Sequence, residues 1–181
     1  LVPYEKATVH FLSPTMHYGL GVFEGIRCYN TSSGGAIFRP KEHIRRFFDS
    51  AKIYRMDEIG FDQETIVEAL RKLVRINDLS ACYLRPILFR GYGDVGVLSV
   101  NNPIEVFIVC WEWGKYLGSQ LLNVMVSSYE RPNPRAVPVE AKVTGHYTNS
   151  ILATTEAKAK GFDEALLLDE NGSVAEASGA N

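Results

Sequence analysis

The chain has 181 residues, of which 46% are apolar and 22% are charged, a balance typical of a globular protein that can build a core. Its formal net charge of −2 gives no electrostatic case for a nucleic acid or an anionic membrane as a partner. No apolar run approaches the roughly 20 residues of a membrane helix, and no signal peptide is visible.

The cysteines and the chain ends suggest further expectations. Cys28, Cys82 and Cys110 each lie within an apolar or aromatic stretch, their number is odd, and no Cys-x-x-Cys pair is present. We therefore expect buried free thiols in a reducing compartment, a cytoplasmic location and no metal site. The chain starts without Met in a strand-like segment and stops after another one, so we expect a fragment of a longer protein.

The first elements along the chain predict strands and then two helices. Residues 7–12 are typical of a strand, and the glycine pair Gly34-Gly35 predicts the turn of a hairpin between strands at 26–29 and 36–39. Helices are expected after Pro40 and after Asp62, which is a good N-cap residue. Apolar residues at helical spacing identify their core faces: Ile44, Phe47, Ala51, Tyr54, Ile66, Leu70, Leu73 and Val74.

Two further strands complete this first part of the chain. Residues 81–90 and 104–113 are rich in β-forming side chains and are joined by a glycine-rich loop. The loop is not a dinucleotide-binding fingerprint, because no helical pattern follows it. We assign residues 1–114 to a small N-terminal α/β domain and residues 115–121 to a linker.

Residues 122–181 predict the beginning of a larger second domain. A strand at 122–129 is followed by a proline-rich loop at 131–138 and a helix at 147–160 that Gly161 terminates. Strands at 164–168 and 173–177 flank an Asn-Gly turn and form a hairpin.

Lys142 is the candidate catalytic residue, and Glu176 is its candidate partner in binding a cofactor. Lys142 follows the stiff proline-rich loop and precedes a helix, whereas Glu176 lies just after the hairpin turn. A lysine that forms a Schiff base, with an acidic partner for a pyridinium nitrogen, is what a pyridoxal phosphate (PLP) site needs. From the spacing alone, a solvated lysine and an exposed carboxylate would be more common than a PLP site. The surrounding motifs are what favour the PLP site.

Those motifs resemble the branched-chain amino-acid aminotransferases, which belong to the PLP enzymes of fold type IV. They occur in the same order over essentially the whole chain. The residues are His17-Tyr18-Gly19, Val22-Phe23-Glu24-Gly25-Ile26-Arg27-Cys28-Tyr29, Glu42-His43-Ile44-Arg45-Arg46-Phe47-Phe48-Asp49-Ser50-Ala51, Tyr83-Leu84-Arg85-Pro86, Trp113-Gly114-Lys115-Tyr116-Leu117-Gly118, Ala141-Lys142 with Gly145 and Tyr147, and the run from Glu176 to Asn181. The resemblance implies an α/β (α+β) fold with its C-terminal part absent here, and PLP as the cofactor.

The resemblance assigns cofactor roles to four residues. Lys142 is implied to bind the cofactor covalently and to act as the catalytic base, and Glu176 to face the pyridine nitrogen. Arg46 is implied to contact the phosphate, for which its fork of donors is suited, and Tyr147 to lie near the phenolic oxygen. Arg45 is adjacent to Arg46, and the motif register selects Arg46.

The resemblance also assigns the substrate site. Arg85 is implied to bind the second carboxylate of glutamate. Val100 is implied to contribute to the active site of a neighbouring subunit, in a homodimer or a higher assembly of dimers. Each aromatic residue could equally be a core residue. The implied pocket for the substrate side chain is formed by Tyr18, Phe23, Gly25, Tyr83, Trp113 and Tyr116.

The expected activity is transfer of the amino group of leucine, isoleucine or valine to 2-oxoglutarate. A D-amino-acid aminotransferase, an aminodeoxychorismate lyase and a non-catalytic relic of this fold stay open as alternatives. Arg85 and the motif at 113–118 favour the branched-chain activity, and the retained pair of Lys142 and Glu176 disfavours a relic. The chain departs from the family at Ala180, where a glutamate is frequent, and the family's remaining phosphate contacts are expected beyond Asn181.

Overall fold

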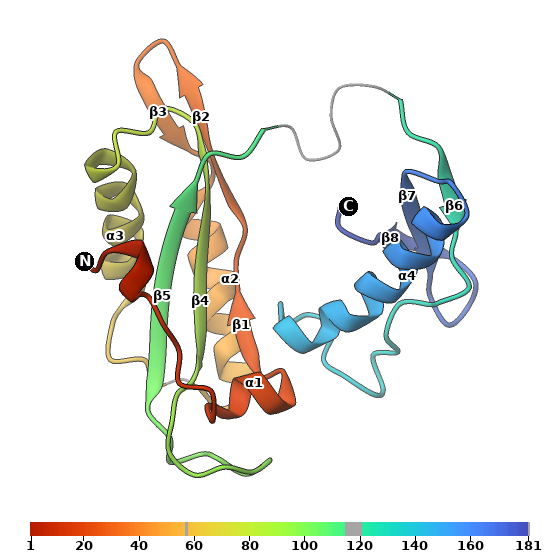
Figure 1. Cartoon of the computed structure of the whole chain (residues 1–181), viewed down its shortest axis with the longest axis horizontal. Helices are drawn as coiled ribbons and strands as arrows, with labels where there is room; N and C mark the ends of the chain where they lie inside the picture. Colours follow the sequence, from red (N-terminus) through yellow and green to blue (C-terminus); the bar gives the residue numbers. More distant parts are fainter. Residues whose placement is uncertain (57, 115–120, 181) are drawn as a thin grey trace. The chain divides into compact units, whose positions relative to one another are not determined.

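The computed structural model describes residues 1–56, 58–114 and 121–180, and Figure 1 traces them along the chain. The chain folds into two compact units, each with its own sheet. Unit 1 comprises Leu1–Glu112 together with Ala141–Gly145, and unit 2 comprises Trp113–Glu140 and His146–Asn181. The domain limits at 114 and 121 stay a prediction, and the expected linker at 115–120 lies outside the described residues.

Unit 1 is built on a five-stranded antiparallel sheet. The central strand β4 (Cys82–Arg90) pairs on one edge with β1 (Gly21–Phe23) and β2 (Ile26–Thr31), and on the other edge with β5 (Ile104–Trp111). Strand β3 (Gly34–Ile37) pairs with β2. The register along β4 is continuous across β1 and β2, which are therefore two parts of one extended run interrupted at residues 24 and 25.

Pro86 explains that interruption. The backbone N–H of Glu24 donates to the carbonyl oxygen of Pro86 at 3.0 Å. Proline has no N–H with which to return the bond, so the ladder is broken at this position. The interruption at Glu24 and Gly25 therefore lies within the sheet, between β1 and β2, which both pair with β4.

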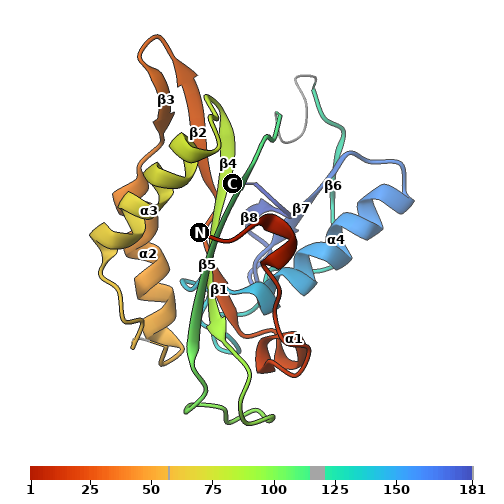
Figure 2. The ribbon, with the colours of Figure 1, turned by 60° about the vertical axis from the view of Figure 1, so that its left-hand side comes forward.

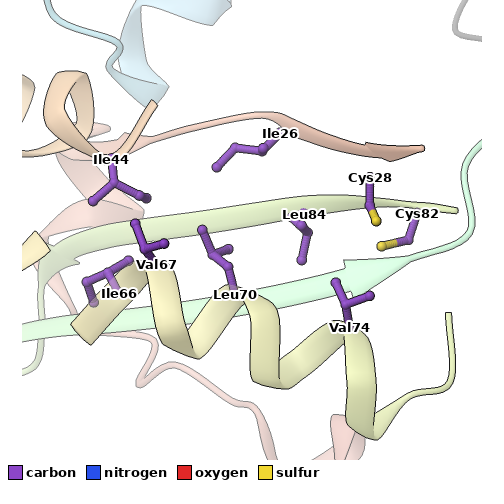
Figure 3. Packing of buried hydrophobic residues seen from close by; sticks show 9 residues of the cluster. All are labelled: Ile26, Cys28, Ile44, Ile66, Val67, Leu70, Val74, Cys82 and Leu84. Atoms are coloured by element: carbon purple, nitrogen blue, oxygen red, sulfur yellow. The ribbon is translucent and has the colours of Figure 1, made fainter. Parts of the chain in front are cut away.

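Helices α2 (Pro40–Ile53) and α3 (Gln63–Ile76) cover one face of this sheet, as Figure 2 shows. Both predicted helices are confirmed, with Pro40 in the first turn of α2 and the Asp62 carboxylate accepting from the backbone N–H of Thr65 at 2.8 Å. The residues predicted to face the core from these helices are buried, except Tyr54 and Leu73, which are only partly buried. Figure 3 shows the cluster between α2, α3 and the sheet: Ile26, Cys28, Ile44, Ile66, Val67, Leu70, Val74, Cys82 and Leu84.

The three cysteines are free thiols, as expected. Cys28 and Cys82 are buried and lie opposite each other on β2 and β4, whereas Cys110 on β5 is only partly buried. Burial, together with the neighbouring Cys28 and Cys110, raises the pKa of the Cys82 thiol to about 12.

The strand predicted at residues 7–12 is wrong. A 3-10 helix, η1 (Tyr4–Lys6), is followed by irregular backbone over these described residues and then by α1 (Pro14–Tyr18). The β-forming composition is present, but Phe11 is 72% exposed. A strand is stable only when a neighbour pairs with it, and composition does not provide that neighbour.

The hairpin of β2 and β3 is confirmed, but its turn is displaced from the predicted position. Thr31 pairs with Gly34, so Ser32 and Ser33 form the turn and the glycines begin β3. A Cβ atom on Gly35 would lie 3.1 Å from the Cys28 sulfur and 3.1 Å from the carbonyl oxygen of Ser80. Gly35 therefore serves close packing and not the reversal of the chain.

Unit 2 contains a three-stranded sheet in the order β6-β7-β8. Strands β6 (Val124–Val126) and β7 (Glu164–Leu168) are parallel, and β8 (Val174–Ala177) is antiparallel to β7. Helix α4 (Tyr147–Ala159), preceded in the chain by η2 (Thr144–His146), packs Ala153 and Ala157 against Ala165 and Leu167. The predicted helix and hairpin are confirmed, and the strand expected at 122–129 is shorter.

Candidate functional site

The Lys142 segment is anchored on both sides within unit 1. The backbone N–H of Lys142 donates to Oγ of Ser50 on α2 at 3.1 Å, and its carbonyl oxygen accepts from the N–H of Phe23 at 3.1 Å. Val143 forms a bridge with Val22, and both side chains are buried in the core beside α2. The segment thus continues the sheet beyond β1 and holds the Lys142 backbone in a defined place.

A close contact between two glycines fixes the end of this segment. The N–H of Gly145 donates to the carbonyl oxygen of Gly19 at 2.9 Å, and the Thr144 hydroxyl donates to the same oxygen at 2.6 Å. A Cβ atom on Gly145 would lie 2.9 Å from that oxygen. Gly19 has φ of 68°, which favours glycine. Gly19 and Gly145, which both belong to family motifs, therefore allow the two backbone segments to contact each other closely.

The partly buried Lys142 side chain lies on the face of the sheet opposite α2 and α3. Val22 and Val143 point toward α2, so the alternation of side chains directs Phe23 and Lys142 to the other face. The amine nitrogen of Lys142 lies 5.2 Å from the centroid of the Phe23 ring. The guanidinium carbon of Arg85 lies 4.5 Å from the centroid of the same ring. Two cationic groups of the expected site thus share one aromatic ring.

Arg85 is oriented by Tyr83 on the same face of β4. Nη2 of Arg85 donates to the Tyr83 hydroxyl at 3.0 Å, and Nε of Arg85 is buried without a hydrogen-bond partner among the described residues. A Cβ atom on Gly25 would lie 1.9 Å from the Tyr83 hydroxyl oxygen. Gly25 is therefore needed to leave room for the group that holds Arg85.

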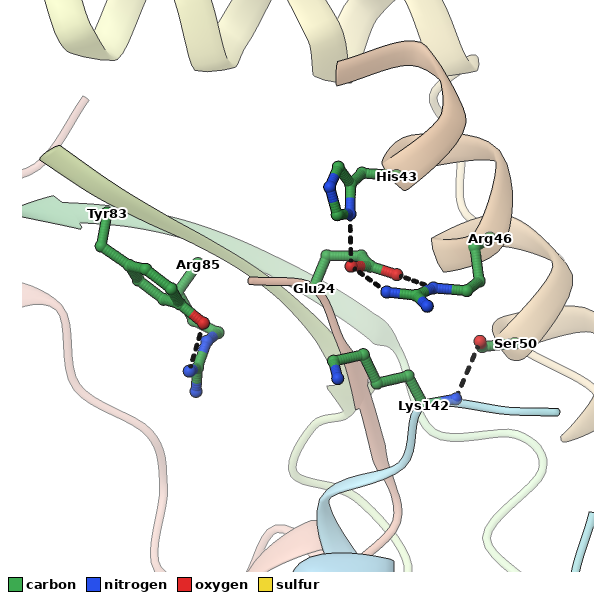
Figure 4. A network of polar contacts seen from close by, with 7 residues as sticks. All are labelled: Glu24, His43, Arg46, Ser50, Tyr83, Arg85 and Lys142. Carbon is green, nitrogen blue, oxygen red and sulfur yellow. Dashed lines mark hydrogen bonds and ion pairs between the residues drawn. The ribbon is translucent and has the colours of Figure 1, made fainter. Parts of the chain in front are cut away.

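Glu24 is a buried carboxylate that binds two side chains of α2, as Figure 4 shows. Arg46 donates to both of its oxygens, from Nε at 2.5 Å and from Nη2 at 2.8 Å, and His43 Nδ1 donates at 2.8 Å. Glu24 is fully buried, whereas the side chain of Arg46 is 51% exposed and that of His43 is 24% exposed. The bidentate pair fixes the plane of the Arg46 guanidinium.

The charge of Glu24 is maintained by these donors. Burial by itself raises the pKa of the Glu24 carboxyl, but the hydrogen bonds from His43 and Arg46 outweigh it and hold that pKa below 4.5. Arg46 and Ser50 are four residues apart on α2 and so share one helical face. Helix α2 thus holds the Lys142 backbone through Ser50 and also carries Arg46, the residue that the family resemblance assigns to the cofactor phosphate.

Glu176 and Tyr147 belong to unit 2. Glu176 lies on β8, opposite Leu167 of β7, and forms an ion pair with Nε of Arg131. Burial and the positive charge of Arg131 lower the pKa of His146, the residue before Tyr147. Tyr147 is the first residue of α4 and is partly buried.

Of the other expected substrate residues, Tyr18 and Val100 belong to unit 1 and Trp113 belongs to unit 2. Tyr18 ends α1 and is 48% exposed, and Val100 lies in the loop between β4 and β5 and is 52% exposed. Trp113 in unit 2 is 37% exposed, and Tyr116 lies outside the described residues. The roles of all the expected site residues stay predictions.

The sequence interpretation missed two residues that support the expected site: Glu24 and Ser50. Glu24 had a visible signal in the sequence. It follows the apolar pair Val22-Phe23 and precedes Gly25, and an acidic residue is unusual in such an apolar strand region. Ser50 lies within a family motif, but nothing in the sequence assigned it a role, since its contact with Lys142 spans 92 positions of the chain.

Metal ligands and membrane helices are not found in the described part of the chain. Within residues 1–56, 58–114 and 121–180, no group of three or more His, Cys, Asp or Glu side chains is arranged to hold a metal ion. No helix over the same ranges has the length and apolar character needed to cross a membrane.

Comparison with known proteins identifies the family of the chain. The family model described as Amino-transferase class IV matches residues 21–181, so the chain belongs to this family, and the predicted resemblance and α/β fold class are confirmed. Relatives named branched-chain-amino-acid aminotransferase, from Pseudomonas aeruginosa and Escherichia coli (strain K12), are 44% and 42% identical over 100% of this chain. The chain spans 60% of the length of these two curated relatives.

Two solved structures give the same result for the fold. The branched-chain aminotransferase from the archaeon Thermoproteus uzoniensis, solved with norvaline, has a TM-score of 0.94 and 37% identity, over 99% of this chain and 60% of that chain. The branched-chain amino acid aminotransferase from Thermobaculum terrenum, solved in its PLP form, has a TM-score of 0.87 and 34% identity, over 98% of this chain and 59% of that chain.

Proposed function

We propose that the protein is a PLP-dependent aminotransferase that exchanges the amino group of leucine, isoleucine or valine with 2-oxoglutarate, giving glutamate and a branched 2-oxo acid. The observation that carries the proposal is the anchored Lys142, whose amine shares the Phe23 ring with Arg85. The names of the relatives support the substrate class.

The residues present fit the chemistry of PLP. Lys142 offers a primary amine, Arg46 a guanidinium for the phosphate, Glu176 a carboxylate for the pyridine nitrogen and Tyr147 a hydroxyl for the phenolic oxygen. When bound, PLP supplies an electron sink that stabilises negative charge at the substrate Cα. The similar enzyme from Thermobaculum terrenum was solved in its PLP form, which supports this assignment.

Lys142 is proposed to accept the proton from the substrate Cα on its Nζ and to return it in the reverse half-reaction. Proton transfer requires the donor and acceptor to be held within hydrogen-bond reach. The bonds from Lys142 to Ser50 and from Phe23 to Lys142 fix the start of the side chain, so its amine searches a small volume.

The two substrates differ in their side chains, and unit 1 offers a group for each. The Phe23 and Tyr83 rings provide apolar surface for a branched side chain. Arg85 provides the charge for the second carboxylate of glutamate. Its guanidinium donates to Tyr83 from Nη2 and has further donors for a carboxylate, and a charge-assisted bond of this kind is strong.

Assembly and location are also proposals. In the loop that carries Val100, Val97 and Leu98 are 87% and 80% exposed. Large apolar side chains exposed together in one loop are typical of a contact surface between proteins, which supports the expected homodimer. The three free thiols support a reducing, cytoplasmic location.

The test is a single-turnover absorbance measurement on the intact, PLP-loaded protein. L-leucine, added without a 2-oxo acid, is expected to change the visible absorbance of the cofactor, and D-alanine is not. Lys142→Ala is expected to abolish the change, whereas Lys72→Ala, at an exposed position of α3, is expected to retain it. A response to D-alanine alone would contradict the substrate class, and a response to neither would favour a lyase or a relic.

A further inference from the structure

We propose that Trp111 is a positioning residue for Arg85 and thereby sets how well the site accepts a second carboxylate relative to a branched apolar side chain. This inference rests on the proposed function, because it concerns the dicarboxylate half of the exchange. Trp111 lies outside the motifs that carry the family resemblance, and only its place in the sheet connects it with Arg85.

The sheet register brings Trp111 to Arg85. Trp111 is the last residue of β5 and lies directly opposite Tyr83 on β4. Tyr83 and Arg85 are two residues apart, so all three side chains share the face opposite α2 and α3. The ring centroids of Trp111 and Tyr83 are 4.9 Å apart with an interplanar angle of 49°, and the Arg85 guanidinium carbon lies 6.0 Å from the Trp111 ring centroid.

Three aromatic rings therefore surround the guanidinium of Arg85. Its central carbon lies 4.5 Å from the Phe23 centroid, 5.2 Å from the Tyr83 centroid and 6.0 Å from the Trp111 centroid. Aromatic faces attract a guanidinium without neutralising its charge. Trp111 acts on Arg85 through its own ring and through Tyr83, whose hydroxyl accepts from Arg85.

Arg85 has no ion pair with a carboxylate within the described parts of the chain, and its buried Nε has no partner there. Figure 4 shows the contrast with Arg46, whose guanidinium is bound to the Glu24 carboxylate, while Arg85 donates to the hydroxyl of Tyr83. A cation held by rings and lacking an internal counter-ion is receptive to an anionic ligand. The rings determine where that cation is presented.

Trp111 is a suitable test position because it is 37% exposed at the end of a strand. Trp111→Leu removes the aromatic face, whereas Trp111→Phe keeps a smaller one. The matched control is Tyr29→Leu, which removes a 49% exposed ring of the same sheet that lies 5.9 Å from the guanidinium carbon of Arg27.

The experiment measures equilibrium binding of glutarate and of 4-methylpentanoate to the PLP-loaded protein by calorimetry. These acids stand for the dicarboxylate and for the branched side chain, and neither has an amino group to transfer. Trp111→Leu is expected to weaken glutarate binding about three- to tenfold and to leave 4-methylpentanoate binding within about twofold. Trp111→Phe is expected to recover most of the glutarate affinity, and Tyr29→Leu to change neither.

Equal weakening of both acids by Trp111→Leu would show a general structural effect and overturn the inference, as would no weakening of either. If the wild-type protein responds to L-leucine in the absorbance test but Trp111→Leu does not selectively weaken glutarate binding, only the role of Trp111 is refuted. If the wild-type protein gives no absorbance response to L-leucine and binds neither acid, the proposed function fails first and the inference fails with it.

Discussion

Replacing Glu24 by glutamine tests whether the buried carboxylate holds the Arg46 and His43 side chains of α2 by its charge. The substitution keeps the shape of the side chain but removes the charge and turns one acceptor oxygen into an NH2 donor. That donor would face the N–H groups of Arg46 and His43, which donate at 2.8 Å in the wild-type protein. Two donors facing each other cannot form a hydrogen bond.

The magnitude follows from the exposure of the partners. Removing one member of a fully buried ion pair costs about 3–5 kcal/mol. Here only Glu24 is fully buried, and the Arg46 side chain is 51% exposed, so water can solvate the guanidinium in the variant. We therefore expect a loss of about 2 kcal/mol, close to that of one hydrogen bond to a charged group. For a chain of this size the midpoint of thermal unfolding should fall by about 4–8 °C.

The assay is urea denaturation of wild-type and Glu24→Gln protein at a series of pH values. The pKa of Glu24 lies below 4.5 in the folded state, so its ionised form stabilises the fold above pH 4.5, and this contribution is lost as the pH falls below that value. Glutamine does not titrate. The difference between the two proteins should thus be largest near pH 7 and should narrow in acid.

The control is Glu42→Gln, which removes the same charge from an exposed position on α2 and should leave the urea midpoint at pH 7 nearly unchanged. A Glu24→Gln protein as stable as wild type at pH 7 would refute the reasoning. So would a stability difference that stays constant below pH 4.5, since it would then arise from packing and not from charge.

Three further results are expected. Phe47→Ala, at a fully buried position of α2, should lower the free energy of unfolding by about 3–5 kcal/mol in urea, and a loss below about 1 kcal/mol would contradict the packing. Cys82, whose pKa burial raises to about 12, should react with Ellman's reagent at pH 8 only after unfolding, so fast reaction of the folded protein would argue against its burial. Lys160 and Ser127 donate to Glu156 and lower its pKa to about 2, so Glu156→Gln should reduce the loss of stability between pH 4.5 and pH 2, which a fluorescence titration would detect.

The local sequence determined the elements whose signals are local. The helices α2, α3 and α4 were predicted because apolar spacing, Pro40, the N-cap Asp62 and the terminal Gly161 act within a few residues of the chain. The hairpin of β7 and β8 was predicted for the same reason, since an Asn-Gly turn joins adjacent strands.

Elements that depend on distant partners were predicted less well. Residues 7–12 have the composition of a strand, yet strand formation requires a neighbour that composition does not specify. Gly34 and Gly35 were assigned to the turn, but Ser32 and Ser33 form it, and Gly35 is needed for the close approach of Cys28 and of the Ser80 carbonyl.

The sequence motifs identified the family and its expected lysine, because a motif specifies which residue types occur at which positions. They did not reveal what holds those residues. The contacts of Ser50 with Lys142, of Glu24 with Arg46 and of Trp111 with Arg85 join different elements. Only the tertiary structure decides these contacts, because the strand register and the packing of α2 on the sheet bring together side chains that carry no local signal of one another.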